Sequence, residues 1–208
     1  MRFLLEPDLS SYTDEAYEAD LRLLPEQRYE KAVKYRLQAD RKRCVRAYML
    51  LWEGLRQEYG PVAAPIFDFG EHGKPFLHMS PGLFFSLSHT GNAALCVLHS
   101  QPVGADIEMI RSHHLSHVLR LFSEQEQESV QQAEQPESRF TEIWTRKESF
   151  LKLTGQGLVG TRILRDIPSE DTDTILFETV IRVMDGFVFS ICQWKTPPTG
   201  VADGGSRF

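Results

Sequence analysis

The sequence has few cysteines and no long apolar run. Its three cysteines, Cys44, Cys96 and Cys192, are scattered, and no two of them stand at Cys-x-x-Cys spacing. This pattern argues against a disulfide framework and favours buried thiols in a reducing compartment, so we expect a cytoplasmic protein. No stretch approaches the roughly 20 apolar residues of a membrane span. The early Glu6 and Pro7 are not typical of a secretory signal. We therefore expect no membrane association.

The sequence also lacks an excess of positive charge. Its net charge is −6, which argues against general binding of nucleic acids. Eight of the 23 basic residues nevertheless gather within 19 positions: Arg28, Lys31, Lys34, Arg36, Arg41, Lys42, Arg43 and Arg46. They can form a solvated helix face beside a core stripe. They can also form the locally basic surface that recognition of a small polyanion requires.

A nucleophilic serine motif is absent as well. Ser88 and His89 are adjacent, but no Gly-x-Ser-x-Gly sequence accompanies them. Neighbouring residues on a strand point to opposite faces, so the two side chains are not expected to meet as nucleophile and base. A role in binding a phosphate or a ribose fits this pair better.

Periodicity and turn residues predict an α+β fold. We expect a helical region at about 25–59, broken near 36–40, and further helices at about 114–122, 123–134 and 138–154. We expect strands at 3–5, 84–89, 93–99, 103–108, 174–183 and 187–194, a polar loop after the first of these strands, and a loop at 67–75. A division near Gln101-Pro102 separates an N-terminal half, 1–101, from a C-terminal half, 102–195. Residues 196–208 are expected to form a mobile tail.

Two acidic motifs stand about forty residues apart. Asp106 and Glu108 are two apart on an expected strand and therefore share a face. Glu148 and Lys152 are four apart on an expected helix, where they lie one above the other. Three carboxylates suit a hard cation such as Mg²⁺, and nearby lysines suit a polyphosphate held by that cation. The pattern indicates a site that can move a phosphoryl group.

A cluster of three histidines is a weaker candidate for a metal site. His113, His114 and His117 lie close in sequence, and His113 and His117 would face alike on a helix. Zinc needs a third or fourth ligand, and no zincin-type Glu follows His113. We therefore assign no metal site to these histidines.

Four motifs in order resemble the 4′-phosphopantetheinyl transferase superfamily, in particular its longer Sfp-type (surfactin-synthetase-activating) class. They are Gly73-Lys74-Pro75-Phe76, Phe85-Ser86-Leu87-Ser88-His89-Thr90-Gly91, Gly104-x-Asp106-Ile107-Glu108 and Trp144-x-x-Lys147-Glu148-x-x-x-Lys152. The resemblance implies Mg²⁺-dependent transfer of the phosphopantetheine arm of coenzyme A to a carrier-protein serine, with release of adenosine 3′,5′-bisphosphate. It also implies two similar α+β subdomains related by pseudo-twofold symmetry, with the site between them.

The resemblance assigns the acidic motifs to metal binding and catalysis. Asp106, Glu108 and Glu148 correspond to the metal-binding acids of the family. Lys152 corresponds to the lysine that contacts the phosphates, and Lys147 to its neighbour in the motif. The two lysines are five positions apart, about 500° of helical rotation, so a shared direction is not required by the spacing. A surface salt bridge is the other interpretation of Lys147. The proton of the carrier serine would pass to Glu148 or to a metal-bound water.

The resemblance also implies the coenzyme A contacts. Lys31, Lys34 and Arg43 fall where the family places basic contacts to the 3′-phosphate. Gly73, Lys74 and Pro75 match the loop around the adenine, and Ser88 and His89 match the pair that holds the nucleotide end.

The partners follow from the same resemblance. We expect an acyl or peptidyl carrier protein as substrate, no nucleic acid and no membrane partner, and a monomer, because one chain supplies both halves. A non-enzymatic module that binds coenzyme A or a carrier protein is the alternative. A third possibility is hydrolysis or transfer acting on another nucleotide diphosphate.

Overall fold

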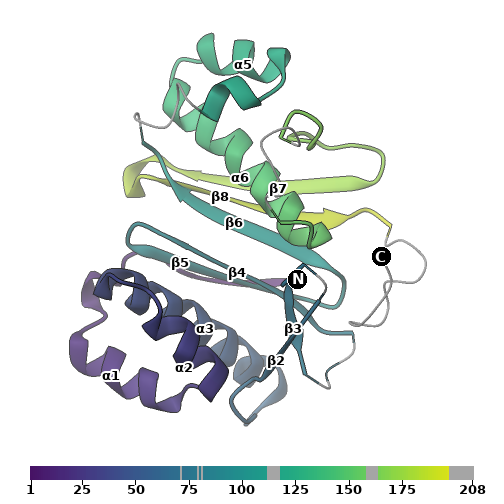
Figure 1. Cartoon of the computed structure of the whole chain (residues 1–208). Helices are drawn as coiled ribbons and strands as arrows, with labels where there is room; N and C mark the ends of the chain where they lie inside the picture. Colours follow the sequence, from purple (N-terminus) through teal and green to yellow (C-terminus); the bar gives the residue numbers. More distant parts are fainter. Residues whose placement is uncertain (71, 79, 81, 112–117, 158–163, 197–208) are drawn as a thin grey trace.

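Two helical layers enclose two β-sheets in the computed structural model (Figure 1). The structure describes residues 1–70, 72–78, 80, 82–111, 118–157 and 164–196. The histidine cluster and nearly all of the expected tail therefore lie outside the described residues. No helix in these ranges is both long and apolar enough to cross a membrane. The mixture of helices and antiparallel sheets confirms the predicted α+β class.

The N-terminal half has a three-stranded antiparallel sheet covered by helices. Its strand order is β1-β5-β4, with β1 at Arg2–Glu6, β5 at Ala93–His99 and β4 at Phe84–Thr90. Its helices are α1 (Asp14–Leu23), α2 (Glu26–Val33) and α3 (Gln38–Tyr59), and a short 3₁₀ turn, η1, covers Leu9–Ser11. The predicted break in the 25–59 helix is confirmed, because α2 and α3 are separate helices.

Two predictions for this half are wrong. The stretch expected as a polar loop contains α1, whose first turn is capped by the side chain of Thr13, which accepts a hydrogen bond from the amide of Ala16. The expected loop at 67–75 contains an antiparallel hairpin, β2 (Phe67–Phe69) with β3 (Pro75–Leu77). Phe67 and Leu77 pair in this hairpin, and both side chains are buried. Burial of these two side chains stabilises the hairpin. Each of its strands has only three residues, and so short a strand shows little periodicity in the sequence.

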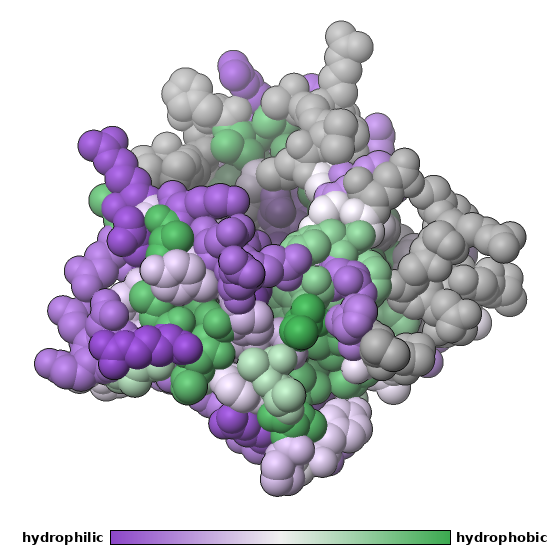
Figure 2. Space-filling model, turned by 60° about the horizontal axis from the view of Figure 1, so that its bottom comes forward, coloured by the Kyte–Doolittle hydropathy of each residue, from purple (hydrophilic) through white to green (hydrophobic). Residues whose placement is uncertain are grey.

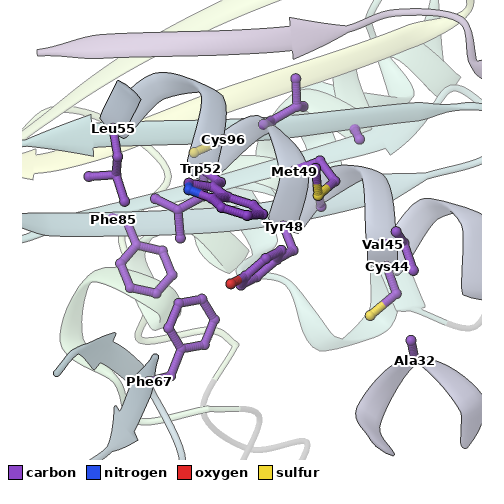
Figure 3. Packing of buried hydrophobic residues seen from close by; sticks show 14 of the residues in the cluster. Ala32, Cys44, Val45, Tyr48, Met49, Trp52, Leu55, Phe67, Phe85 and Cys96 are labelled. Atoms are coloured by element: carbon purple, nitrogen blue, oxygen red, sulfur yellow. The ribbon is translucent and has the colours of Figure 1, made fainter. Parts of the chain in front are cut away.

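Helix α3 forms the core of this half. Its buried face includes Cys44, Tyr48 and Leu51, and these pack against the outer face of the sheet. In Figure 3, Tyr48 on α3 points toward Phe67 of the β2–β3 hairpin, and their ring centroids are 5.8 Å apart. Phe67 also lies 4.8 Å from the ring of Phe85 on β4. The hairpin is thereby fixed to α3 and β4 by aromatic packing.

The C-terminal half repeats the combination of three antiparallel strands and one long helix. Its strand order is β6-β8-β7, with β6 at Val103–Met109, β8 at Phe187–Trp194 and β7 at Ile175–Arg182. The helices with bounds among its described residues are α5 (Glu124–Gln131) and α6 (Pro136–Thr154), with 3₁₀ turns η3 (Leu119–Leu121) and η4 (Val183–Asp185). The structure confirms the capping box of Ser123 and Glu126. The pseudo-twofold relation of the halves stays a prediction.

The helix expected at 114–122 is only partly described. Of residues 118–122, Val118 is helical and Leu119–Leu121 form the 3₁₀ turn η3. Phe122 ends this turn and is fully buried against Phe140 of α6, with stacked rings 5.2 Å apart. The apolar residues that suggested a helix are thus explained, in this part, by packing onto α6.

The two sheets pack face to face and also meet along β4 and β6. Leu95 and Val97 of β5 contact Ala105 and Ile107 of β6 in a buried cluster. Along the seam, the hydroxyl of Ser86 accepts a hydrogen bond from the amide of Ala105 at 2.9 Å. Serine side chains of β4 therefore satisfy backbone amides of the β6 edge, in place of a regular ladder. The seam brings residues of the two halves into contact.

Figure 2 shows a face of the molecule on which hydrophilic and apolar side chains are both exposed. Hydrophilic side chains cover much of the face in Figure 2, with apolar residues gathered toward its middle. Exposed apolar side chains include Leu23, Tyr29 and Leu37. Single exposed apolar residues of this kind are ordinary on a protein surface.

Candidate active site

Strand β6 and helix α6 bring the two acidic motifs together. Residues alternate along β6, so that Ala105 and Ile107 face the neighbouring sheet while Asp106 faces α6. Helix α6 presents Lys152, and its ammonium group lies 2.7 Å from Oδ1 of Asp106. A glycine at position 104 permits this close approach, because a Cβ there would lie 1.9 Å from the carbonyl oxygen of Ser149. The expected meeting of strand and helix is confirmed.

Hydroxyl groups of β4 complete the contacts of these charged residues. Ser88 donates a hydrogen bond to Oδ1 of Asp106 at 2.8 Å and accepts one from Lys152 at 2.9 Å. Thr90 donates to Oε2 of Glu108 at 2.8 Å. The charged cluster therefore rests on both halves of the chain, and β4 fixes the positions of its acids.

Burial changes the acidity of two carboxyl groups in the cluster. Burial raises the pKa of Glu148 to about 7, and the negative charge of Asp106 adds to the shift. Burial also raises the pKa of Glu108, again with a second contribution from Asp106. These mutual effects place Asp106, Glu108 and Glu148 near one another. Carboxylates that repel one another in a partly buried site favour a bound cation.

Two carboxylate oxygens of the cluster have no hydrogen-bond partner in the described chain. They are Oδ2 of Asp106 and Oε1 of Glu148, and both are buried. Unpaired buried carboxylate oxygens are costly unless a cation or a proton compensates them. As the side chains stand, no three His, Cys, Asp or Glu residues among those described form a set closed enough to hold an ion. Oxygen ligands are nevertheless what Mg²⁺ prefers.

The structure separates Lys147 from the other predicted site residues. Its side chain is fully buried, and its ammonium group donates to the carbonyl oxygens of Leu164 and Ile167, each at 2.7 Å. Its third partner is Glu126 of α5, at 2.6 Å. A lysine has three N–H donors, and all three are used here. The surface salt bridge considered for Lys147 is instead a buried one, and the geometry does not support a contact with phosphate.

A cavity of about 340 Å³ opens beside Glu148 and Lys152. Its walls come from α2, α3, β4, α6 and the loop of the β2–β3 hairpin. Seven of the predicted site residues line it: Lys31, Gly73, Lys74, Pro75, His89, Glu148 and Lys152. Burial lowers the pKa of His89 to about 4, with Lys152, Arg43 and Lys31 adding to the shift. The imidazole is therefore neutral at neutral pH.

Lys74 closes the cavity against the C-terminal half. Its ammonium group donates to the carbonyl oxygen of Leu153 at 2.8 Å and lies 3.4 Å from that of Val103. The stem of Lys74 packs over Gly155, which ends α6 in a left-handed conformation with φ 76°. Lys74 thus joins the hairpin loop to the end of α6.

Three predicted coenzyme A contacts do not line this cavity. Lys34 is exposed on the short break between α2 and α3. Arg43 is bonded to Asp40 and to the carbonyl oxygen of Gly91, which joins α3 to the β4–β5 turn. Ser88 is buried behind the wall, against Asp106. The geometry gives Arg43 and Ser88 positioning contacts within the protein.

The cavity is also lined by residues to which the sequence analysis assigned no role in a site. Arg28, Cys44 and Ala47 line it from α2 and α3, and Phe85 lines it from β4. Arg28 belongs to the basic stretch between Arg28 and Arg46, but nothing in the sequence distinguishes it from the other basic residues there. Only its burial, at 5% exposure, distinguishes it from the solvated basic residues.

A second cavity, of about 210 Å³, lies on the other side of the acidic cluster. Glu108, Met109 and Arg111 line it from the end of β6 onward, and Phe140, Thr141 and Trp144 line it from α6, together with Val118. Glu108 faces this cavity while Glu148 faces the first one. The carboxylates therefore stand between two cavities, one with several cations and one largely apolar.

The part of the chain that holds the acidic cluster is similar in sequence to known proteins. Residues 102–191, which hold the acidic cluster, match the model of the 4′-phosphopantetheinyl transferase superfamily. The chain is 34% identical over 130 residues to the 4′-phosphopantetheinyl transferase psf-1 of Bacillus pumilus, covering 61% of this chain and 56% of that protein. It is 32% identical over 137 residues to the 4′-phosphopantetheinyl transferase Sfp of Bacillus subtilis (strain 168), covering 64% and 61%.

A cyanobacterial protein shows a similar likeness over a shorter region. The 4′-phosphopantetheinyl transferase HetI of Nostoc sp. is 38% identical over 100 residues, covering 44% of this chain and 42% of that protein. The chain spans somewhat less than two thirds of the length of the curated relatives that it matches.

Proposed function

Because this chain is related to the 4′-phosphopantetheinyl transferase superfamily, we propose that it transfers the 4′-phosphopantetheine arm of coenzyme A to a serine of a carrier protein and releases adenosine 3′,5′-bisphosphate. The observation that carries this proposal is the cluster of Asp106, Glu108, Glu148 and Lys152 at the seam between the halves. A site that moves a phosphoryl group needs charge stabilisation more than covalent chemistry, and this cluster offers it.

Asp106, Glu108 and Glu148 are the residues proposed to hold Mg²⁺. The unpaired buried oxygens of Asp106 and Glu148 support this assignment, since a hard cation is the partner that such oxygens accept. When bound, Mg²⁺ would neutralise negative charge on the diphosphate and on the leaving group.

The side chain of Lys152 is proposed to bind a phosphate oxygen of the diphosphate. Its ammonium group reaches the cavity and is held at the acidic cluster by Asp106 and Ser88. A point charge fixed in this way stabilises the charge that develops as the phosphate ester bond breaks. The carrier serine would attack the β-phosphate in line with this leaving group.

Glu148 is the carboxylate best suited to accept the proton of the carrier serine. Burial raises its pKa to about 7, close to the range in which a general base works at neutral pH. A carboxylate that ligates a cation is a weaker base, so water remains the other candidate for the proton acceptor. We therefore propose Glu148 both as a ligand of Mg²⁺ and as a candidate general base.

The first cavity is the proposed coenzyme A site. The loop of Gly73, Lys74 and Pro75 lies at its wall with His89, as the family resemblance implies for the nucleotide end. The second, apolar cavity beside Glu108 would then face the incoming carrier protein. The reacting groups would meet at the carboxylates between the cavities. We propose that one chain, acting as a monomer in the cytoplasm, suffices. The three cysteines are free and buried, which fits a reducing compartment.

Intact-mass spectrometry tests this function. Purified apo acyl and peptidyl carrier proteins are incubated with the protein, coenzyme A and Mg²⁺. We expect a mass gain of one phosphopantetheine, which chelation abolishes and which a carrier with alanine at the modified serine does not show. Glu148→Gln is expected to abolish the gain, while Glu134→Gln, a change in an exposed carboxyl, keeps it.

Other outcomes would separate the alternatives. Binding of coenzyme A without transfer to any carrier would favour a binding module over an enzyme. Competition by nucleotide diphosphates without a pantetheine arm, at affinities equal to that of coenzyme A, would favour chemistry on another nucleotide. Absence of both binding and transfer would contradict the proposed function.

A further inference from the structure

Strand β4 places a row of hydroxyl groups against strand β6. Ser86, Ser88 and Thr90 are two positions apart, so their side chains share one face of β4, and all three are buried. Ser86 bonds to the backbone of β6, and Ser88 donates to Oδ1 of Asp106. Thr90, the last of the row, donates to Oε2 of Glu108 at 2.8 Å. Both acids of β6 are therefore held by hydroxyl groups from the other half of the chain.

The contact with Thr90 fixes the position of Glu108. Among the hydrogen bonds of the described residues, this is the only one that the carboxylate of Glu108 accepts. Oε2 is engaged, so Oε1 is the oxygen left for another partner. Asp106 shows the same division, since Oδ1 is held by Ser88 and Lys152 while Oδ2 has no partner. In each acid, one oxygen is held and the other can ligate a hard cation.

Glu108 has room to move if this contact is lost. Its side chain lines the second cavity, of about 210 Å³, which Arg111 lines as well. The positive charge of Arg111 acts on Glu108 and attracts its carboxylate. Without the hydroxyl of Thr90, this carboxylate can turn into the cavity and away from Asp106 and Glu148. The hydrogen bond from Thr90 therefore selects one orientation of Glu108 over another.

Thr90 is itself held by its surroundings. Its side chain is buried at 8% exposure, and it ends β4 just before the turn to β5. Arg43 of α3 donates to the carbonyl oxygen of Gly91 in this turn. The amide of Leu9 in η1 donates to the carbonyl oxygen of Asn92 at 2.8 Å. Because a β-branched side chain has few χ1 rotamers, the hydroxyl of Thr90 keeps a fixed direction.

We propose that Thr90 is a positioning residue that orients Glu108 toward the divalent cation of the transfer reaction. This inference rests on the proposed function, in which Asp106, Glu108 and Glu148 hold Mg²⁺. Thr90 belongs to one of the ordered motifs, but the resemblance gives it no role. It acts through Glu108, and it is not a ligand of the cation. Loss of such a partner of a metal ligand lowers metal affinity by about 10- to 100-fold.

Binding of Mn²⁺, a paramagnetic substitute for Mg²⁺, tests this role apart from catalysis. The protein with coenzyme A is titrated with Mn²⁺, and EPR spectroscopy measures the free ion. Thr90→Val keeps the β-branched shape but removes the donor, so we expect it to bind Mn²⁺ at least about tenfold more weakly. Thr90→Ser keeps a hydroxyl group and should bind Mn²⁺ nearly as tightly as the wild type. Thr174→Val, at an exposed threonine before β7, is the matched control.

Transfer kinetics separate positioning from a general structural role. In Thr90→Val, the Mg²⁺ concentration that gives half the maximal rate should rise along with the Kd for Mn²⁺. The kcat at saturating Mg²⁺ should stay near that of the wild type, and so should the affinity for coenzyme A measured by calorimetry without metal. A merely structural role would lower kcat and the affinity for coenzyme A at every Mg²⁺ concentration.

A double variant tests whether Thr90 acts through Glu108. Glu108→Gln is expected to weaken Mn²⁺ binding, because it removes a charged ligand. Adding Thr90→Val to Glu108→Gln should weaken the binding little further, since the residue that Thr90 orients is already changed. Equal further weakening in this background would overturn the inference.

The remaining outcomes separate the inference from the proposed function. A folded Thr90→Val protein that binds Mn²⁺ as tightly as the wild type would overturn the inference and leave the function intact, as would a loss that excess Mg²⁺ does not correct. If Thr90→Val does not fold, Thr90→Ala decides the same question, because it also lacks the hydroxyl. The expected differences in Mn²⁺ binding without any transfer by the wild type would support the role of Thr90 and contradict the function. A wild type that neither binds Mn²⁺ nor transfers would contradict both.

Discussion

The Nζ atom of Lys152 lies 2.7 Å from Oδ1 of Asp106, and this contact connects α6 to β6 at the seam between the two halves. Asp106 has a side chain only 6% exposed, whereas that of Lys152 is 32% exposed toward the cavity. The lysine therefore compensates a buried charge on one side and presents its own charge on the other. The pair acts as one unit, and its parts are not expected to contribute separately.

A double-mutant cycle on this pair tests that coupling. Lys152→Met and Asp106→Asn should each lower the kcat/KM of phosphopantetheine transfer at least about a hundredfold, as expected for lost charge stabilisation. The kcat/KM of the double variant should be only slightly lower than that of the less active single variant, because the effects of groups that act as a unit are not additive. Lys195→Met, at an exposed lysine, is the matched control. Additive losses would show that the two residues act independently.

Lys147 is expected to contribute to stability and not to phosphate binding. Lys147→Met leaves Glu126 and two carbonyl oxygens without their donor, so the free energy of unfolding should fall by about 3 kcal/mol. Adding Glu126→Leu should restore part of the loss, because the remaining buried charge is removed. Urea denaturation of the single and double variants measures both effects. A Lys147→Met protein of normal stability that cannot transfer would instead support a catalytic role.

The sequence predicts the parts of the site that depend on regular periodicity. The period of two on β6 predicts that Asp106 and Glu108 share a face, and the spacing of four on α6 predicts the same for Glu148 and Lys152. That the two motifs form one site was expected from their chemistry and from the family resemblance, and the structure brings Lys152 to 2.7 Å from Asp106. The resemblance to the transferase superfamily, expected from the ordered motifs, is matched by the family model over residues 102–191 and by relatives such as psf-1 of Bacillus pumilus. The roles proposed for these residues remain predictions.

Other features depend on tertiary packing and are not visible in the pattern. Helix α1 buries Tyr17 but few other residues, so its apolar periodicity is weak, although the cap at Thr13 was a usable signal. The partners of Lys147 come from α5 and from residues 164–167, which lie far from it along the chain. Arg28 differs from its basic neighbours only in its burial. Such differences arise from contacts between elements, which spacing does not encode.

Gly104 is expected to be intolerant of any side chain. A Cβ at this position would lie 1.9 Å from the carbonyl oxygen of Ser149 and 2.3 Å from the amide of Leu153, both backbone atoms of α6. Gly104→Ala should therefore displace α6 and lower the free energy of unfolding by about 3 kcal/mol or more. At Gly70 the nearest atom to an added Cβ is 3.7 Å away, so Gly70→Ala is the matched control. Chemical denaturation compares the two, and equal stability of both variants would refute the close approach of β6 and α6.

His89 should make stability depend on pH in the acidic range. Burial, with the charges of Lys152 and Arg43, lowers its pKa to about 4, below the ordinary value of 6.5. Between these values the unfolded chain binds the proton more readily than the folded protein does. The free energy of unfolding is therefore expected to fall as the pH falls from 6.5 toward 4, by up to about 3 kcal/mol.

Comparison of the wild type with His89→Gln isolates this contribution from the other titrating groups. Glu148 acts in the opposite direction, since burial raises its pKa to about 7 and the folded state takes up its proton first. Both proteins contain Glu148, so the difference between their unfolding free energies reports on His89. That difference should be constant above pH 7 and should shift in favour of the variant below pH 6.5. His78→Gln, at an exposed histidine, should change little. Parallel curves for the wild type and His89→Gln would mean that the imidazole is not held neutral by the cations and the burial of this cavity.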